Sequence, residues 1–450
     1  FYDLPLSINV SANKVRILTM PINEVISEVT NRIVQRSRDS RSQYLDNMQD
    51  QLNSGPRRAH LTCGNQAHAY ASTSKDKASL SRTSNGNIGI VTAYNDMLSA
   101  HQPFESYPEI IRKAAREFGG TAQVAGGVPA MCDGVTQGQP GMELSLFSRD
   151  VIALAASIAL SHNTFDTSIY LGVCDKIVPG LVISAATFGF LPAVFAPAGP
   201  MPSGIPNDKK SIVRQKFATG EISRKELMKA EMASYHSPGT CTFYGTANSN
   251  QMLMEFMGLH LPGASFVTPN TPLRTALTKL ATKRALEITS LGNYFTPAYQ
   301  ILDEKAFVNG IVGLMATGGS TNLVLHLPAM AKAAGIKLEI SDFDDISSVT
   351  PLMAKIYPNG LADVNHFHAA GGLNYMIAEL LEAGYLHNDV QTIMGLGLET
   401  YTKEPKLIDG KIEFVPSSTK SHNEKILRPV SDPFQKSGGI KRLDGNLGSC

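Results

Sequence analysis

The middle of the chain alternates between short apolar runs and longer helical patterns. The apolar runs have the length and composition of buried strands and lie at residues 88–94, 122–125, 168–173 and 193–196. Helical patterns at 107–118 and 148–160 separate the first three runs. Because strands that alternate with helices build βαβ units, we expect an α/β fold with a mostly parallel sheet and helices on both faces.

Helical patterns dominate the rest of the chain. In the first of them, residues 21–51, one apolar face is formed by Val25, Val29, Ile33 and Val34. Later helices are predicted at 209–233, 251–259, 272–291 and 323–334. Most of the chain is therefore expected to be helical around a small central sheet.

These patterns divide the chain into four parts. We expect a helical segment at residues 20–80 and the α/β domain at 81–400. Residues 401–450, with lysines, prolines and short β-like pieces, indicate a linker into a new element. Residues 1–19 show no pattern and are expected to be a non-native or disordered extension.

The composition is that of an ordinary soluble globular protein. Hydrophobic residues make up 43% and charged residues 18% of the chain, which excludes a disordered or membrane-spanning protein. The formal net charge is +1 and no basic run is interleaved with aromatic residues, so a nucleic-acid binder is excluded too. Five cysteines without a secretory segment indicate a reducing compartment, and we expect the cytoplasm. The expected partner is a small molecule.

Two of the cysteines stand directly beside hard ligands. Cys132 precedes Asp133, and Cys174 precedes Asp175 and Lys176. Thiolates favour iron–sulfur clusters or zinc, whereas carboxylates favour Mg²⁺, so the same loops could serve a soft and a hard inorganic site. The other interpretation is that each cysteine is only a small buried hydrophobic side chain.

A third cysteine extends this pattern. Cys241 is far from Cys132 and Cys174 in the sequence, so a local Cys-x-x-Cys knuckle is excluded and only the fold could gather them. Three thiolates would leave one iron of a four-iron cluster free to act as a Lewis acid. Cys174 follows a predicted strand and precedes a predicted turn at Pro179 and Gly180, at the strand end where α/β sheets bind ligands.

A Gly-Gly-Ser-Thr-Asn turn at residues 318–322 precedes an apolar helix. Its backbone N–H groups and the positive end of the helix dipole suit an anion. The alternative is an ordinary helix N-cap.

Several motifs together resemble the dihydroxy-acid and sugar-acid dehydratase family. In chain order they are GGVPAMCDG (126–134), GQPGMELS (138–145), GVCDKIVPG (172–180), AGPMPSG (198–204) and ATGGSTN (316–322). Three further stretches, at 93–102, 140–143 and 235–248, are most similar to members that act on a phosphorylated sugar acid. The resemblance implies a hydro-lyase that dehydrates 6-phosphogluconate to 2-dehydro-3-deoxy-6-phosphogluconate in gluconate catabolism.

Other functions stay open at this point. Within the same class, the substrate could be an aldonic acid or a dihydroxy acid of branched-chain amino-acid synthesis. From a different class, a metal-binding or redox-sensing protein would use the same thiols without catalysis. The large apolar helices around the sheet also lead us to expect a homodimer.

The resemblance implies two inorganic cofactors. Cys174 and Cys241 are the implied cluster ligands, with Cys132 as the candidate third ligand and Cys63 in reserve. Relatives with a two-iron cluster carry a cysteine near residues 97–99, where this chain has none, so a [4Fe-4S] cluster is expected and [2Fe-2S] is the alternative.

The implied magnesium ligands are Asp133, Asp175 and a carbamylated Lys176. A carbamate converts the lysine from a cation into an oxygen ligand. The alternative for Lys176 is a plain salt bridge to one of the two aspartates.

Substrate contacts are expected at two places. One is the loop before residue 210, with Ser203, Lys209 and Lys210, and the other is the helix start at Ser320, Thr321 and Asn322. For His101 and His236 a core role is the alternative to a substrate contact, and the acidic and histidine-rich stretch 363–368 is interpreted as structural.

The family's members are longer than this chain. They end in a β-barrel domain that supplies a further glutamate ligand and the serine that acts as the base, and neither lies within these 450 residues. Residues 438–448 resemble the beginning of that barrel. The resemblance therefore implies a fragment that is inactive alone, with its catalytic base outside it.

Overall fold

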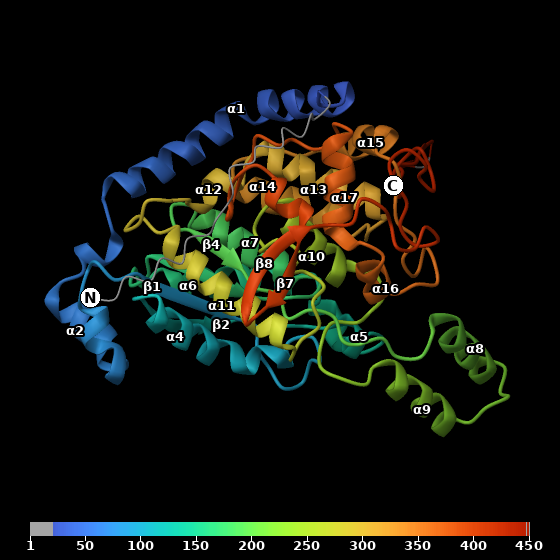
Figure 1. Ribbon diagram of the computed structural model, residues 1–450, viewed down its shortest axis with the longest axis horizontal. Helices are drawn as coiled ribbons and strands as arrows, with labels where there is room; N and C mark the ends of the chain where they lie inside the picture. The colour runs from blue at the N-terminus through green and yellow to red at the C-terminus, as the bar shows by residue number, and fades with distance from the viewer. Residues whose placement is uncertain (1–20, 447, 450) are drawn as a thin grey trace.

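The structure is a computed structural model that describes residues 21–446 and 448–449 (Figure 1). The prediction for residues 1–19 lies outside the described residues. Among the described helices, none combines the length and the apolar character that crossing a bilayer requires.

A four-stranded parallel sheet forms the centre of the molecule. Its strands are β1 (Asn87–Thr92), β2 (Thr121–Gly127), β3 (Thr167–Leu171) and β4 (Ala193–Phe195), in the spatial order β2-β1-β3-β4. In the parallel register Ile88 of β1 lies between Ala122 of β2 and Thr167 of β3. The predicted α/β class and parallel sheet are confirmed, although β3 ends at Leu171 rather than at residue 173.

Helices cover both faces of this sheet. Right-handed crossovers that run from β1 to β2 and back from β2 to β3 place their helices, α4 (Tyr107–Glu117) and α6 (Ser148–Leu160), on opposite faces. On one face α11 (Pro272–Glu287) packs on α4, and on the other α7 (Ile177–Thr187) packs on α6. Every residue of β1 and β3 is buried as a result.

The turn predicted at Pro179 and Gly180 is wrong, because both residues lie in the first turns of α7. Proline is tolerated there, since the first N–H groups of a helix have no intrahelical partner. Gly180 lets α7 approach α6 closely, because a Cβ atom at this position would lie 2.6 Å from the carbonyl oxygen of Arg149.

A second helical layer lies beyond α7. Its members are α10 (Thr246–Phe256), α13 (Glu304–Thr317), α14 (Leu323–Ala333), α15 (Ile340–Val349), α16 (Val364–Ala369) and α17 (Gly372–Glu382). Helix α14 packs on α7, and α10 packs on α13. The long helix α1 (Glu24–Asn53) crosses α13 and α15 at the upper edge of Figure 1. Its buried face includes Ile26, Val29 and Ile33, whereas Val34, predicted to share that face, is 45% exposed because it is rotated out of the stripe.

The helix predicted at 209–233 is wrong as a single element. It is a hairpin of α8 (Asn207–Ala218) and α9 (Arg224–Ser234). Gly220, with φ 77°, ends the first helix, and the Ser223 side chain caps the second. Figure 1 shows this hairpin extending away from the body at the lower right.

The remaining elements are short. They comprise helices α2 (Cys63–Ala71), α3 (Lys77–Leu80), α5 (Asp133–Thr136) and α12 (Ala298–Ile301), and the 3-10 helices η1 (Arg57–His60), η2 (Ser74–Asp76), η3 (Gln102–Ser106), η4 (Pro140–Leu144) and η5 (Glu399–Thr402). Antiparallel pairs form between β5 (Gln391–Thr392) and β6 (Gly395–Leu396), β7 (Lys403–Ile408) and β8 (Lys411–Pro416), and β9 (Asp444–Gly445) and β10 (Gly448–Ser449). The described part of residues 401–450 thus contains two hairpins and no closed barrel.

Candidate metal centre

Three cysteines from three separate loops meet beyond the carboxyl edge of the sheet. Cys132 lies after β2, Cys174 lies after β3, and Cys241 lies in the loop before α10. From β1 the chain crosses to β2 on one side, and it then returns to β3 on the other side of β1. The topological switch point of the sheet therefore lies at the carboxyl ends of β1 and β3. None of the three thiols is in a disulfide.

The thiols act on one another electrostatically. A hydrogen bond with Cys174 is the main cause that lowers the pKa of Cys132 to about 6, which leaves that group largely a thiolate at neutral pH. The same hydrogen bond, together with burial and the charges of Cys132 and Cys241, raises the pKa of Cys174. Burial and the charge of Cys132 raise the pKa of Cys241 to about 11. The three thiols therefore interact with one another, and together they offer a set of soft sulfur ligands.

Two asparagines of α10 hold the backbones that carry these thiols. Asn250 donates from Nδ2 to the carbonyl oxygens of Cys174 and Asp175, at 3.0 and 2.9 Å. Asn248 donates to the carbonyl oxygen of Cys241 at 2.8 Å. Cys174 has φ 75°, a left-handed conformation that a non-glycine residue rarely adopts. Such strain persists only where the surroundings fix it, and the Asn250 clamp does so here.

A buried lysine lies between two aspartates next to the thiols. Lys176 is 4% exposed, and its Nζ is 2.5 Å from Oδ2 of Asp133 and 2.7 Å from Oδ2 of Asp175. This is the salt bridge that the alternative interpretation of Lys176 expected. The structure therefore brings together all three residues that the sequence suggested as magnesium ligands.

The remaining oxygen of each aspartate also has a side-chain partner. The Ser145 hydroxyl donates to Oδ1 of Asp133 at 2.5 Å. Oδ1 of Asp175 is 3.3 Å from Nε2 of His326, and its Oδ2 also accepts from Nδ2 of Asn322 at 3.3 Å. Burial opposes ionisation of Asp175, but the hydrogen bonds from His326 and Lys176 and the charge of Lys176 lower its pKa to about 2. Both carboxylates are thus held in fixed orientations.

The two aspartates and Lys176 line a cavity of about 300 Å³. Ser145, Asn322 and His326 line it too, together with the exposed carboxylate of Glu143. The described residues contain no group of three His, Cys, Asp or Glu side chains spaced to hold a single metal ion. Two carboxylates alone are too few for Mg²⁺, which prefers six oxygen ligands.

The sequence did not single out Ser145 or His326. Ser145 closes the second of the family motifs, and His326 lies one helical turn after Asn322. Both positions can be read from the sequence, but the carboxylates that they contact are more than ten residues away along the chain. Only the fold reveals these contacts. Asn322 was predicted at a helix start, yet its side chain caps no N–H group and joins the aspartate cluster instead.

Cys63, the reserve ligand, is not part of this centre. It is the exposed first residue of α2. Figure 1 shows α2 at one end of the molecule and α5, which follows Cys132 directly, well away toward the other end.

The predicted substrate residues divide into two groups. Lys210 is 9% exposed, its Nζ lies 4.4 Å above the ring of Tyr235, and its charge acts on Cys241. Lys209 beside it is exposed. Ser203, also exposed, accepts a hydrogen bond from Asn365. At the other place, the Ser320 hydroxyl is 2.8 Å from that of Thr246, and Thr321 is exposed.

The other histidines lie outside the centre or in the core. His101 is fully buried, its Nε2 is 3.2 Å from the carbonyl oxygen of Val173, and burial lowers its pKa to about 4. His236 is exposed. In the stretch 363–368, Asp363 and His366 form the capping box of α16, which agrees with a structural role.

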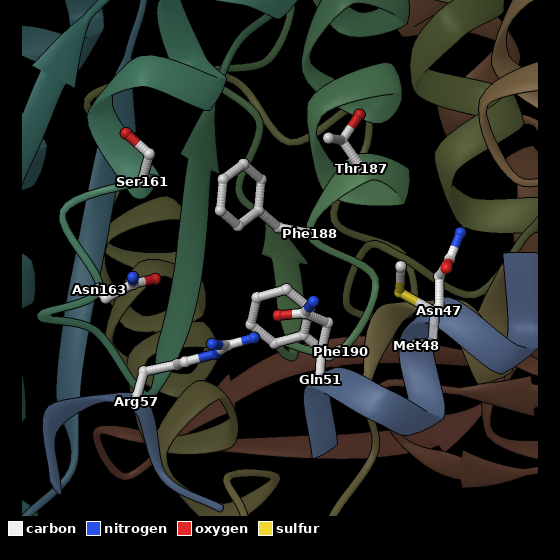
Figure 2. Close-up of a pocket in the computed structure, with 9 residues that line it drawn as sticks. All are labelled: Asn47, Met48, Gln51, Arg57, Ser161, Asn163, Thr187, Phe188 and Phe190. Carbon is white, nitrogen blue, oxygen red and sulfur yellow. The ribbon is translucent and has the colours of Figure 1, made fainter. Parts of the chain in front are cut away.

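A second hollow, of about 420 Å³, lies at the opposite edge of the sheet (Figure 2). Ser161 and Asn163 precede β3, and Phe188 and Phe190 precede β4, so these residues are at the amino ends of the strands. Its lining includes no cysteine and no carboxylate. This hollow therefore lacks the thiols and carboxylates that define the other centre.

Comparison with known proteins shows the family to which this chain belongs. A family model described as the N-terminal part of dihydroxy-acid/6-phosphogluconate dehydratases matches residues 85–401. This span begins just before β1 and contains all the residues of the thiol and aspartate centre.

Curated relatives match nearly the whole chain. It is 62% identical over 433 residues to the phosphogluconate dehydratase of Rhizobium meliloti (strain 1021), a match that covers 96% of the chain and 72% of the relative. The phosphogluconate dehydratase of Escherichia coli (strain K12) is 56% identical over 428 residues, covering 95% and 71%. The dihydroxy-acid dehydratase of Caldanaerobacter subterraneus subsp. tengcongensis is 33% identical over 366 residues, covering 80% and 62%.

Proposed function

Because the chain belongs to the dihydroxy-acid/6-phosphogluconate dehydratase family, we propose that it dehydrates 6-phosphogluconate to 2-dehydro-3-deoxy-6-phosphogluconate. The reaction removes a proton from C2 and hydroxide from C3, which leave as water, and the resulting enol becomes the ketone. The observation that carries the proposal is the meeting of three thiols with two aspartates and a lysine at one sheet edge.

The thiol set fits an iron–sulfur cluster. Cys132, Cys174 and Cys241 come from three separate loops and influence one another's protonation. We propose that they hold a [4Fe-4S] cluster, with [2Fe-2S] as the alternative. Such a cluster, with one iron free of protein thiolate, supplies a Lewis acid for the departing C3 hydroxyl.

The oxygen donors fit Mg²⁺ only if Lys176 is modified. Asp133 and Asp175 provide two carboxylates, and a carbamate on Lys176 provides a third anionic ligand between them. We propose that Lys176 is carbamylated in the active enzyme. Mg²⁺ at this place supplies positive charge that offsets the negative charge that develops at the substrate carboxylate.

The chain's own residues then orient these groups and the substrate. Ser145, Asn322 and His326 hold the carboxylates, and Asn250 fixes the loop that joins the thiol and aspartate parts of the centre. For the phosphate we propose Lys210, because it is a buried cation whose charge reaches the Cys241 thiol.

A phosphate-dependence assay tests the function. The intact protein, reconstituted with iron and sulfide without oxygen, is expected to dehydrate 6-phosphogluconate much faster than gluconate. Lys210→Met is expected to raise KM for the phosphorylated substrate about 10- to 100-fold, the effect of losing a charge-assisted hydrogen bond. Turnover of gluconate should stay the same.

Lys209→Ala is the matched control for this assay. Its side chain is the exposed neighbour of Lys210, so we expect both KM values to be unchanged. Equal rates on gluconate and 6-phosphogluconate in the unsubstituted protein would contradict the proposed substrate. An effect of Lys209→Ala on the phosphorylated substrate alone would move the phosphate contact to that residue.

We also propose that the enzyme is a homodimer. Helix α6 presents Leu154 and Ile158, each 66% exposed, one turn apart on its outer face. A helix with such a stripe can pack against its own copy across a twofold axis. Light scattering should give twice the chain mass, and Leu154→Glu should give a monomer. A monomer at micromolar concentration before any substitution would contradict this proposal.

Two further parts of the proposal concern location and architecture. We place the enzyme in the cytoplasm, because its thiols must stay reduced to hold a cluster. We propose that the two hairpins within residues 401–450 lead into a C-terminal β-barrel, and that residues 20–80 and 81–400 are the helical and catalytic parts.

A further inference from the structure

His326 lies at an unusual place in an apolar helix. It is in the second turn of α14, its side chain is 1% exposed, and its helix neighbours Leu323 and Leu327 are fully buried. A histidine on such a face is most often a core side chain bonded to the backbone. Here both ring nitrogens face charged side chains from other elements instead.

These two contacts fix the tautomer of the ring. Nδ1 is 3.5 Å from Nη1 of Arg149 in α6, and a guanidinium can only donate hydrogen bonds. In a neutral imidazole that accepts from Arg149 at Nδ1, the ring proton lies on Nε2. From there it is donated to Oδ1 of Asp175, 3.3 Å away.

While Oδ1 of Asp175 is held by His326, the other oxygen, Oδ2, faces Lys176. Oδ2 lies toward Lys176, at 2.7 Å, as does Oδ2 of Asp133. If Lys176 becomes a carbamate, its positive charge disappears and both aspartates lose their ion pair with it. Oδ1 of Asp175 still keeps its hydrogen bond with His326. Hydrogen bonds of this kind, from groups that do not touch the metal, commonly set the orientation of a ligand.

We propose that His326 is a positioning residue that orients Asp175 as a magnesium ligand, with Arg149 holding the imidazole in the tautomer this requires. The inference rests on the proposed function, because it assumes the magnesium site. It adds that His326 of α14 and Arg149 of α6 together orient Asp175 in the loop before α7.

The test is a titration of the intact protein with Mn²⁺ in place of Mg²⁺, in which the free ion is followed by electron paramagnetic resonance. His326→Leu keeps an apolar packing volume but removes the donor, and we expect about 10- to 100-fold weaker Mn²⁺ binding. His326→Gln places an amide N–H near the position of Nε2 and should restore most of the affinity. His326→Asn is too short to reach Asp175, so it should behave like the leucine variant even if His326→Leu fails to fold.

His387→Leu is the matched control. His387 is also a buried histidine with a side-chain partner, the Thr30 hydroxyl at 2.8 Å, but it lies against α1. Its loss should lower stability without changing Mn²⁺ affinity. Unchanged affinity in both His326→Leu and His326→Asn would overturn the inference and leave the proposed function intact. If the unsubstituted protein binds no Mn²⁺, the proposed magnesium site itself fails, and the inference fails with it.

Discussion

Replacement of Cys174 by serine is expected to remove both the iron–sulfur cluster and the dehydratase activity from the intact protein. The hydroxyl is a harder and far less acidic ligand than a thiol, so it would not replace the thiolate. We expect activity to fall by at least about a thousandfold, equivalent to about 4 kcal/mol of transition-state stabilisation. Visible absorbance and the iron and sulfide content measure the loss of the cluster, and the rate on 6-phosphogluconate measures the loss of activity.

Cys63→Ser is the control for this experiment. Cys63 is an exposed cysteine of α2, outside the centre, so its replacement should leave absorbance, iron content and rate unchanged. Cys132→Ser should instead match Cys174→Ser, because Cys132 is the proposed third thiolate ligand of the cluster. A Cys174→Ser protein that keeps its cluster and its rate would exclude Cys174 as a ligand, and loss of the cluster in Cys63→Ser would restore the reserve assignment.

The sequence predicted the sheet better than it predicted the helical surface. Strands β1, β3 and β4 are buried along their whole length, so each can be recognised as an apolar run without knowledge of its neighbours, whereas β2 is only partly buried. The break between α8 and α9 was missed because the segment is rich in charged residues and its apolar side chains form no clear stripe, as the exposure of Ile212 (49%), Phe217 (40%) and Met228 (52%) shows. Val34 was misplaced for a related reason, since one extra valine beside an apolar stripe does not show which side is buried.

For the site, the sequence identified residues whose identity is chemically unusual, and it missed those whose role depends on contact alone. A cysteine next to an aspartate is conspicuous, and two such pairs, together with the segment around Cys241, suggested one centre before any fold was known. Ser145, Asn250 and His326 are common residue types in ordinary surroundings. Their significance comes from partners that the parallel sheet and α14 bring near, and no local pattern records that proximity.

Lys176→Arg is expected to abolish Mn²⁺ binding and reduce the dehydration rate by at least about a thousandfold, while the fold is kept. Arginine preserves the positive charge and can donate to both Asp133 and Asp175, so it retains the ion pairs seen in the structure. Its guanidinium is not expected to form the carbamate that lysine forms with CO₂. The substitution therefore separates the two interpretations of Lys176, since a salt bridge would tolerate it and a carbamate ligand would not.

Three measurements decide between these interpretations. After growth with ¹³C-bicarbonate, the unsubstituted protein should show a carbamate carbon signal in NMR that is absent from Lys176→Arg. Mn²⁺ affinity and thermal stability show whether the ion site was lost without unfolding. Lys305→Arg, at a more exposed ion pair with Asp389, should change none of these values. Full Mn²⁺ binding and a normal rate in Lys176→Arg would mean that the buried lysine only balances the charge of the two aspartates, and the third oxygen ligand would then have to come from another residue.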